Sequence, residues 1–225
     1  MPRFFLLLIF LLPALALAQA PQAPQVTGRA WMVVDVSSGQ ILAAEKPDER
    51  FEPASLTKLM TAYLVFAALK EKKLALEQQV NVSERAWRAP GSRMFIEPKK
   101  PVSVDELIRG MIVQSGNDAC IALAEQLAGS EEAFAATMNR EADRLGMKNT
   151  KYMNASGLPD PQHYSTARDL HLLASALIRD FPQQYAQYYS LREYRYNGIT
   201  QVNRNRLLWL DNTVDGMKTG FTEAA

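Results

Sequence analysis

The chain has 225 residues, and its 25 lysines and arginines nearly balance its 24 aspartates and glutamates, giving a formal net charge of +1. The sequence contains no basic run, which argues against nucleic acid as a partner. Cys120 is the only cysteine, so the chain cannot form an internal disulfide, and we expect a buried apolar thiol. No metal-ligand spacing occurs in the sequence, so we expect neither a metal nor a cofactor.

Residues 1–20 are typical of a secretory signal peptide. Arg3 provides a positive charge, an apolar run follows from Phe4 to Leu12, and small residues before position 21 fit a cleavage site. The run is short for a membrane span and a proline interrupts it, although an uncleaved anchor stays as an alternative. We therefore expect export from the cytoplasm, a flexible lead-in over 21–28 and a single folded domain over 29–225.

The hydrophobic pattern predicts an N-terminal hairpin followed by a buried helix. Residues 29–36 and 41–44 are strand candidates on either side of a Ser-Ser-Gly-Gln turn. Residues 55–70 are predicted to form a long helix, and apolar side chains cover most of its circumference. A helix with that distribution is expected at the centre of the molecule.

Further helices are predicted over 104–109 and beyond, 119–127, 131–145 and 166–178. Gly129 and Gly146 indicate helix ends, and Ser130 is a candidate N-cap. Residues 217–222 are predicted to form a strand. Strands near both ends, with helices between them, favour an α+β fold with one sheet built from both chain ends.

Three short motifs follow one another along the chain: Ser55-Leu56-Thr57-Lys58, Ser115-Gly116-Asn117 and Lys218-Thr219-Gly220. A single S-x-x-K match carries little weight, because roughly one is expected by chance in a chain of this size. The three motifs together, in this order, are far rarer. They therefore identify the candidate functional residues.

Ser55 and Lys58 have the residue types of a nucleophile and its base. Three residues apart on a helix, they share one face. A serine hydroxyl becomes a strong nucleophile only when a base removes its proton, and burial lowers the pKa of a lysine so that it can act as that base. We predict these roles for Ser55 and Lys58. The alternative is that Ser55 only caps the helix.

Ser115 and Asn117 lie in a break between an apolar stretch and the helix predicted from residue 119. Ser115 is a candidate for relaying a proton to the leaving group. Asn117 is a candidate for holding a substrate amide and for hydrogen bonding to Lys58. Turn composition explains the same residues as the alternative.

Lys218, Thr219 and Gly220 offer a cation, a hydroxyl and a position without a side chain. On a strand, they would let a substrate backbone lie alongside as an added strand. Lys218 and Thr219 then suit a terminal carboxylate. An ordinary solvated lysine is the alternative for Lys218.

The motifs and their flanks closely resemble the D-alanyl-D-alanine carboxypeptidases, which are low-molecular-mass penicillin-binding proteins. The resemblance covers essentially all of residues 25–225, and its flanking segments are 52–61, 111–119, 164–170 and 214–220. It implies a β-lactamase/transpeptidase-like α+β fold. In that fold an antiparallel sheet built from both chain ends packs on helices, and the site lies in a cleft beside an all-helical lobe.

The resemblance also implies further site residues and an activity. The backbone N–H groups of Ser55 and Phe221 would form the oxyanion hole. Arg204 would assist carboxylate recognition, with a plain surface charge as the alternative. A serine D,D-carboxypeptidase would release the terminal D-alanine of a peptidoglycan stem peptide through an acyl-enzyme on Ser55. Penicillins and other β-lactams would acylate the same serine.

Three other functions share these motifs. Class A β-lactamases use a glutamate for deacylation, but residues 154–169 contain none. Gly116 in the second motif also matches the carboxypeptidases better. A D,D-endopeptidase that cleaves peptide cross-links has all three motifs. A non-catalytic penicillin-binding sensor is the alternative from a different class.

The sheet of this family continues beyond the K-T-G strand, yet only residues 221–225 follow Gly220. A strand without its neighbour would leave an unpaired edge. We therefore expect the domain to be incomplete at the C-terminus, and a 225-residue chain to be inactive or poorly folded alone. Relatives often carry a second β domain and an amphipathic C-terminal anchor, through which a periplasmic enzyme would associate with the membrane.

Overall fold

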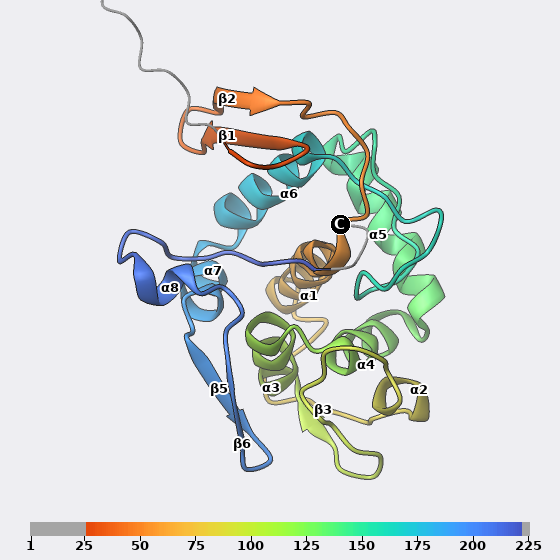
Figure 1. Ribbon diagram of the computed structural model, residues 1–225. Coiled ribbons are helices and arrows are strands. Elements are labelled where there is room, and N and C mark those ends of the chain that lie inside the picture. The colour runs from red at the N-terminus through yellow and green to blue at the C-terminus, as the bar shows by residue number, and fades with distance from the viewer. Residues whose placement is uncertain (1–25, 222–225) are drawn as a thin grey trace, which may run out of the picture.

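The computed structural model describes residues 26–221, which form a largely helical body with short hairpins (Figure 1). The predicted signal peptide, most of the lead-in and residues 222–225 lie outside the described residues. In chain order the elements are β1 (Trp31–Asp35), β2 (Gln40–Glu45), a 3₁₀ turn (Ala54–Thr57), α1 (Lys58–Lys70), β3 (Gln79–Val80), α2 (Glu84–Trp87), β4 (Val102–Ser103), α3 (Val104–Arg109), a π-helical turn (Gly110–Gln114), α4 (Asn117–Ala128), α5 (Glu131–Leu145), α6 (Ala167–Asp180), α7 (Pro182–Tyr189), β5 (Glu193–Tyr196), β6 (Ile199–Val202) and α8 (Leu207–Leu210).

The predicted N-terminal hairpin is confirmed. Strands β1 and β2 pair antiparallel, with Trp31 opposite Glu45 and Asp35 opposite Gln40. The turn forms because the Asp35 carboxylate accepts hydrogen bonds from the backbone N–H groups two and three residues ahead, at 2.8 and 3.2 Å. The hairpin contacts α6 and lies along one side of the helical body (Figure 1).

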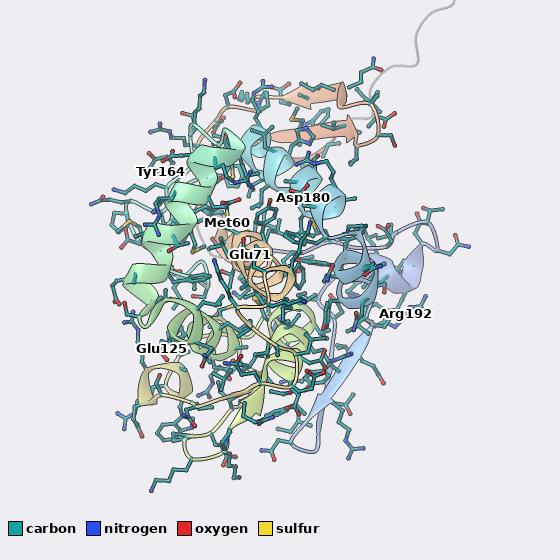
Figure 2. All side chains as sticks on the ribbon, turned by 180° about the vertical axis from the view of Figure 1, so that it is seen from behind. Met60, Glu71, Glu125, Tyr164, Asp180 and Arg192 are labelled. Carbon is teal, nitrogen blue, oxygen red and sulfur yellow. The ribbon has the colours of Figure 1, made fainter. Side chains whose placement is uncertain are left out.

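Helix α1 runs through the centre of the molecule, as its apolar circumference predicts. Figure 2 shows Met60 among the surrounding helices, and this side chain is completely buried. Phe66 stacks on Tyr188 at a centroid separation of 5.8 Å and meets Phe181 edge-on at 5.9 Å. Packing on all sides holds the start of α1, where Lys58 ends the S-x-x-K motif, inside the fold.

The break predicted at the second motif is present. The π-helical turn that follows α3 ends at Gln114, and the next residue, Ser115, has a φ of 64° in the left-handed region. Helix α4 then begins at Asn117, two residues before the predicted start, so Asn117 belongs to its first turn. A left-handed residue between two helical segments redirects the chain, and here it turns the segment toward α1.

Capping residues place the later helices close to their predicted bounds. Helix α5 spans Glu131–Leu145 as predicted: the Ser130 hydroxyl accepts from the N–H of Ala133 at 3.1 Å, and Gly146 ends the helix at a φ of 81°. Helix α6 has Thr166 as its N-cap and continues two residues beyond the predicted end. No helix among residues 26–221 combines the length and apolar character needed to cross a membrane.

The strand predicted over 217–222 is not formed in the described part of the chain. Residues 217–221 carry no strand assignment, and within residues 26–221 strands pair only as three two-stranded antiparallel sheets, β1–β2, β3–β4 and β5–β6. The expected pairing between the N-terminal hairpin and the K-T-G segment is therefore wrong for these residues. A strand exists only where a neighbour accepts and donates its backbone hydrogen bonds, and none of the described strands pairs with this segment.

Gly157 lies in tight contact with the 3₁₀ turn that precedes α1. Its φ is +84°, and a Cβ there would lie 1.7 Å from the carbonyl oxygen of Ala54. Gly157→Ala should therefore lower the free energy of unfolding by about 3–5 kcal/mol, which combines the left-handed penalty with overpacking. Gly129→Ala is the matched control, because Gly129 has a φ of +81° and open space around it, so only about 1–2 kcal/mol should be lost. Urea unfolding of both variants measures the difference, and equal losses would contradict the contact.

Candidate active site

The amine of Lys58 is the centre of a buried hydrogen-bond cluster. Its Nζ lies 3.0 Å from Ser55 Oγ, 2.8 Å from Asn117 Oδ1 and 2.6 Å from the carbonyl oxygen of Ser156. The Lys58 side chain is 1% exposed. A protonated amine donates to all three oxygens. A neutral amine donates to two and presents its lone pair to the third, so the Ser55 hydroxyl can then donate to it.

Burial lowers the pKa of Lys58, and the charge of Arg204 adds to the decrease, whereas the Cys120 and Asp118 side chains oppose it. Desolvation is the largest cause because the charged ammonium is removed from water. The pKa of Lys58 is therefore shifted downward, which is the direction that base catalysis by the S-x-x-K motif needs. The predicted contacts of Lys58 with Ser55 and Asn117 are also confirmed.

Ser115 completes a chain of hydroxyl groups. Its Oγ donates to Ser55 Oγ at 3.0 Å, and the side chain is 2% exposed. Ser55 thus contacts both the amine of Lys58 and the hydroxyl of Ser115, so a proton that leaves Ser55 has two neighbouring acceptors. The positive φ at Ser115 is the backbone distortion that brings its side chain to this point.

The helix-capping alternative for Ser55 is wrong. Ser55 lies inside the 3₁₀ turn, whose cap is Pro53, and neither Pro53 nor Thr57 makes a side-chain capping bond. Ala54, just before the serine, has a φ of 47°. A left-handed residue thus precedes Ser55, and Ser115 is itself left-handed. Backbone strain of this kind concentrates where a side chain must point in one direction.

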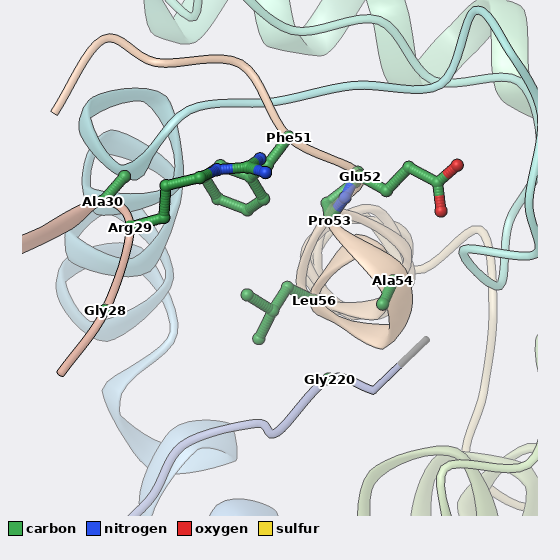
Figure 3. A pocket seen from close by; sticks show the side chains of 9 residues that line it. All are labelled: Gly28, Arg29, Ala30, Phe51, Glu52, Pro53, Ala54, Leu56 and Gly220. Carbon is green, nitrogen blue, oxygen red and sulfur yellow. The ribbon is translucent and has the colours of Figure 1, made fainter. Parts of the chain in front are cut away.

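The K-T-G segment passes directly beside the turn that carries Ser55. A Cβ placed on Gly220 would lie 3.3 Å from Pro53 O and 3.4 Å from Leu56 Cγ, so glycine allows the close approach. Gly220, Ala54 and Leu56 all line a cavity of about 460 Å³. Figure 3 shows Gly220 beside the turn that carries Ala54 and Leu56. Phe221, the residue beyond, is 87% exposed.

Lys218 and Arg204 bring positive charge to the same site. Burial, followed by the charge of Lys58, lowers the pKa of Lys218 to about 7, while its Nζ donates to the carbonyl oxygen of Thr219 at 2.8 Å. Arg204 Nε donates to Gln114 O at 3.3 Å, one residue before Ser115. Without a ligand, the two cations repel one another, and a bound carboxylate would relieve this repulsion. The site therefore favours anion binding.

The sequence of the whole chain shows its family. The profile of a family described as D-alanyl-D-alanine carboxypeptidase matches residues 17–225. The chain belongs to this D-alanyl-D-alanine carboxypeptidase family. D-alanyl-D-alanine carboxypeptidase DacC of Escherichia coli (strain K12) is 48% identical over 226 residues, which cover 97% of this chain and 56% of DacC. The D-alanyl-D-alanine endopeptidase of the same strain is 30% identical over 245 residues, which cover 100% of this chain and 77% of that protein.

Solved structures agree with this family assignment. Penicillin-binding protein 5 from Haemophilus influenzae matches with a TM-score of 0.86 at 45% identity, over 90% of this chain and 60% of that chain. The resemblance to carboxypeptidases and the transpeptidase-like α+β fold class are therefore confirmed. The chain spans about half the length of the curated carboxypeptidases it matches.

Two contacts in this carboxypeptidase-family chain were not predicted from the sequence. Ser156 contributes its backbone carbonyl to Lys58, and the segment is shaped by Asn154, whose Oδ1 accepts from the N–H groups of Ser156, Gly157 and Leu158. The Asn-Ala-Ser-Gly sequence has Asx-turn composition, which was the available signal for this turn. The carbonyl itself has no sequence signature.

The second unpredicted contact joins His163 to Thr57, the residue before Lys58. His163 Nε2 lies 2.9 Å from Thr57 Oγ1, and the N–H of Met153 points at Nδ1 from 3.4 Å. Because Nδ1 accepts, the neutral ring carries its proton on Nε2 and donates it to Thr57. The imidazole thus joins the 3₁₀ turn before α1 to the segment that provides the Ser156 carbonyl.

Cys120 is a further titratable side chain that acts electrostatically on Lys58. Cys120 is fully buried, and burial raises the pKa of its thiol to about 12, which leaves it protonated and unreactive. No group of three or more His, Cys, Asp or Glu side chains in the part of the chain between 26 and 221 could hold a metal ion.

The His163 contact predicts an acid-sensitive fold. Burial lowers the pKa of His163 from 6.5 to about 4, so the folded state resists protonation that the unfolded chain accepts. The contribution of His163 to the free energy of unfolding should be fully present above about pH 6.5. It should fall by about 3 kcal/mol as the pH drops toward 4. Urea unfolding from pH 7 to pH 4 measures this.

His163→Gln should be less stable at pH 7 but should lose less stability on acidification. The matched control is His171→Gln, since His171 is only partly buried and hydrogen bonds within its own helix, 3.1 Å from Ser175 Oγ. An acid loss in His163→Gln equal to that of the unchanged protein would contradict the assignment.

Proposed function

We propose that the protein is a serine D,D-carboxypeptidase that removes the terminal D-alanine from peptidoglycan stem peptides. The observation that carries this proposal is the 3.0 Å contact between Ser55 Oγ and the buried Nζ of Lys58, whose pKa is lowered by burial. The family membership supports the same chemistry. A hydroxyl beside a neutral amine is an activated nucleophile at neutral pH.

The proposed reaction begins with binding of the substrate carboxylate at Lys218, Thr219 and Arg204. Lys58 accepts the proton of Ser55 as the serine oxygen attacks the carbonyl of the penultimate D-alanine. The backbone N–H groups of Ser55 and Phe221 stabilise the resulting oxyanion, a contribution that is typically worth about 3 kcal/mol per donor. Proximity of Gly220 to the Ser55 turn supports this pairing.

Collapse of the tetrahedral intermediate needs a proton on the departing amine. Ser115, 3.0 Å from Ser55, is positioned to pass that proton from Lys58 to the nitrogen of the leaving D-alanine. Asn117 holds Lys58 through its Oδ1 and is proposed to bind the substrate amide as well. Water then hydrolyses the ester on Ser55 and restores the free serine. A β-lactam would also form an ester on Ser55, as its ring C–N bond breaks and the ring nitrogen takes up the proton.

We infer that residues 1–20 direct export, that 21–28 are a lead-in, and that the catalytic domain occupies 29–225. An extracytoplasmic location follows from the substrate class, because peptidoglycan lies outside the cytoplasmic membrane. Membrane attachment through a C-terminal anchor remains part of this proposal. Fractionation of cells that express the full-length protein, with and without residues 1–20, tests the export segment.

A D,D-endopeptidase is the second candidate, since one curated relative with that name is 30% identical to this chain. The higher identity of 48% to a carboxypeptidase favours the first proposal. Incubation of the full-length protein with a pentapeptide ending in D-Ala-D-Ala, and separately with a cross-linked dimer, distinguishes them. Release of free D-alanine supports the carboxypeptidase, and cleavage of the dimer alone supports the endopeptidase.

Substitution of Lys58 tests the assigned base. Lys58→Ala should slow formation of the acyl-enzyme with penicillin by about 10²–10⁴-fold, the usual contribution of a positioned base. Ser55→Ala should abolish covalent labelling altogether. The matched control is Lys70→Ala, an exposed lysine at the other end of α1, which should leave the rate unchanged. Labelling of Lys58→Ala at the unchanged rate would show that another group is the base.

A further inference from the structure

A groove beside the proposed active site is lined by aromatic and basic side chains that the reaction above does not use. The cavity measures about 480 Å³, and its wall includes Trp87, Arg88, Arg93, Phe95, Ile96 and Glu97. Trp87 ends α2, and the other side chains belong to the loop between α2 and β4. Trp87 and Phe95 remain 38% and 41% exposed, although both are large apolar side chains. Two partly exposed aromatic side chains in the wall of one groove indicate a binding surface.

The loop holds Phe95 in a strained conformation. Its φ of 69° lies in the left-handed region, which a bulky aromatic residue rarely adopts. The Asp118 carboxylate stabilises this geometry by accepting from the N–H groups of Met94, Phe95 and Ile96 at 3.0, 2.9 and 3.3 Å. Asp118 itself is fully buried. The fold thus maintains a costly backbone that leaves the Phe95 ring at the surface, and such strain is concentrated at ligand sites.

The groove is joined to the active site through Asn117. The N–H of Asn117 donates to Ser92 O at 2.7 Å, and its Nδ2 donates to Pro90 O at 2.7 Å. Arg93 follows Ser92 directly, so their Cα atoms are about 3.8 Å apart. The loop that carries Arg93 and Phe95 therefore contacts Asn117, and a substrate amide bound at Asn117 would lie next to it.

Charge in the groove favours an acidic ligand. The guanidinium of Arg93 lies 5.3 Å from the Phe95 ring centroid, and that of Arg88 lies 5.5 Å from the Trp87 centroid. Arg93 donates to the carbonyl oxygen of Trp87 at 3.4 Å, which uses one of its five N–H groups. Glu97, the acidic residue in the wall, is paired with Lys100 at 2.6 Å. Arg93 therefore keeps donors for a ligand carboxylate, next to aromatic rings that suit an aliphatic chain.

We propose that this groove binds the acidic part of the stem peptide that precedes the D-Ala-D-Ala pair. Arg93 pairs with a side-chain or α-carboxylate of that segment, while Phe95 and Trp87 pack against its methylene groups. The proposal rests on the proposed carboxypeptidase function, and it adds a specificity site for the acyl donor. Amidation of the peptide carboxylate, which removes its charge, should therefore weaken binding at Arg93.

Binding to the full-length protein carrying Ser55→Ala tests the groove without turnover. The probes are a γ-linked glutamate pentapeptide ending in D-Ala-D-Ala and the same peptide with its glutamate carboxylate amidated. Calorimetry should show about fivefold tighter binding of the acidic peptide, the upper range for a partly exposed ion pair. Adding Arg93→Gln should remove that preference, whereas Arg140→Gln, an exposed arginine on α5, should retain it.

Two further variants and outcomes complete the test. Phe95→Ala should weaken both peptides equally, since the ring contacts methylene groups that they share. An equal affinity of the parent protein for the two peptides, or a preference that survives Arg93→Gln, would overturn the proposal. The proposal would also be overturned if attaching a disaccharide to the peptide raised its affinity while the glutamate carboxylate made no difference. Penicillin labelling and D-alanine release, measured with Ser55 intact, report separately on the proposed function.

Discussion

Burial of the Lys58 amine is the constraint on which the rest of the site depends. An ammonium removed from water is unstable unless oxygens surround it, and the chain provides three from separate segments. The same burial lowers its pKa, which makes the neutral base accessible at ordinary pH. One physical effect thus explains both why the cluster is packed tightly and why it can remove a proton from Ser55.

Burial of that amine requires α1 to be central, and the surrounding architecture follows from this. Helices α4, α5 and α6 all contact α1, and the left-handed backbone at Ala54 and Ser115 turns two serines toward one another. Gly157 lets one backbone segment approach the Ser55 turn more closely than a side chain would permit, and Gly220 lies in close contact with the same turn. The site is therefore positioned by rigid helices, with close backbone contacts that tolerate little change in volume.

Sequence patterns predicted most of the helices and the contacts of Lys58 with Ser55 and Asn117. The agreement for the helices has local causes. Helix α5 matches its predicted bounds because Ser130 and Gly146 provide capping signals within the segment itself. The strand predicted over 217–222 is absent from the described residues because a strand is defined by a partner. His163 and the carbonyl of Ser156 were missed because neither has a spacing that relates it to Lys58. Roles that depend on a bound substrate, those of Thr219, Phe221 and Arg204, stay predictions.

The sequence by itself determined the residue types and their local spacing. Ser55 and Lys58 are three apart on a helix, so their contact follows from helical geometry alone. Only the tertiary structure decided that the carbonyl of Ser156, 98 residues from Lys58, would join Ser55 and Asn117 around the amine. It also decided that water would be excluded there. The physical reason is that desolvation arises from packing between distant segments, and it is desolvation that turns an ordinary lysine into a candidate base.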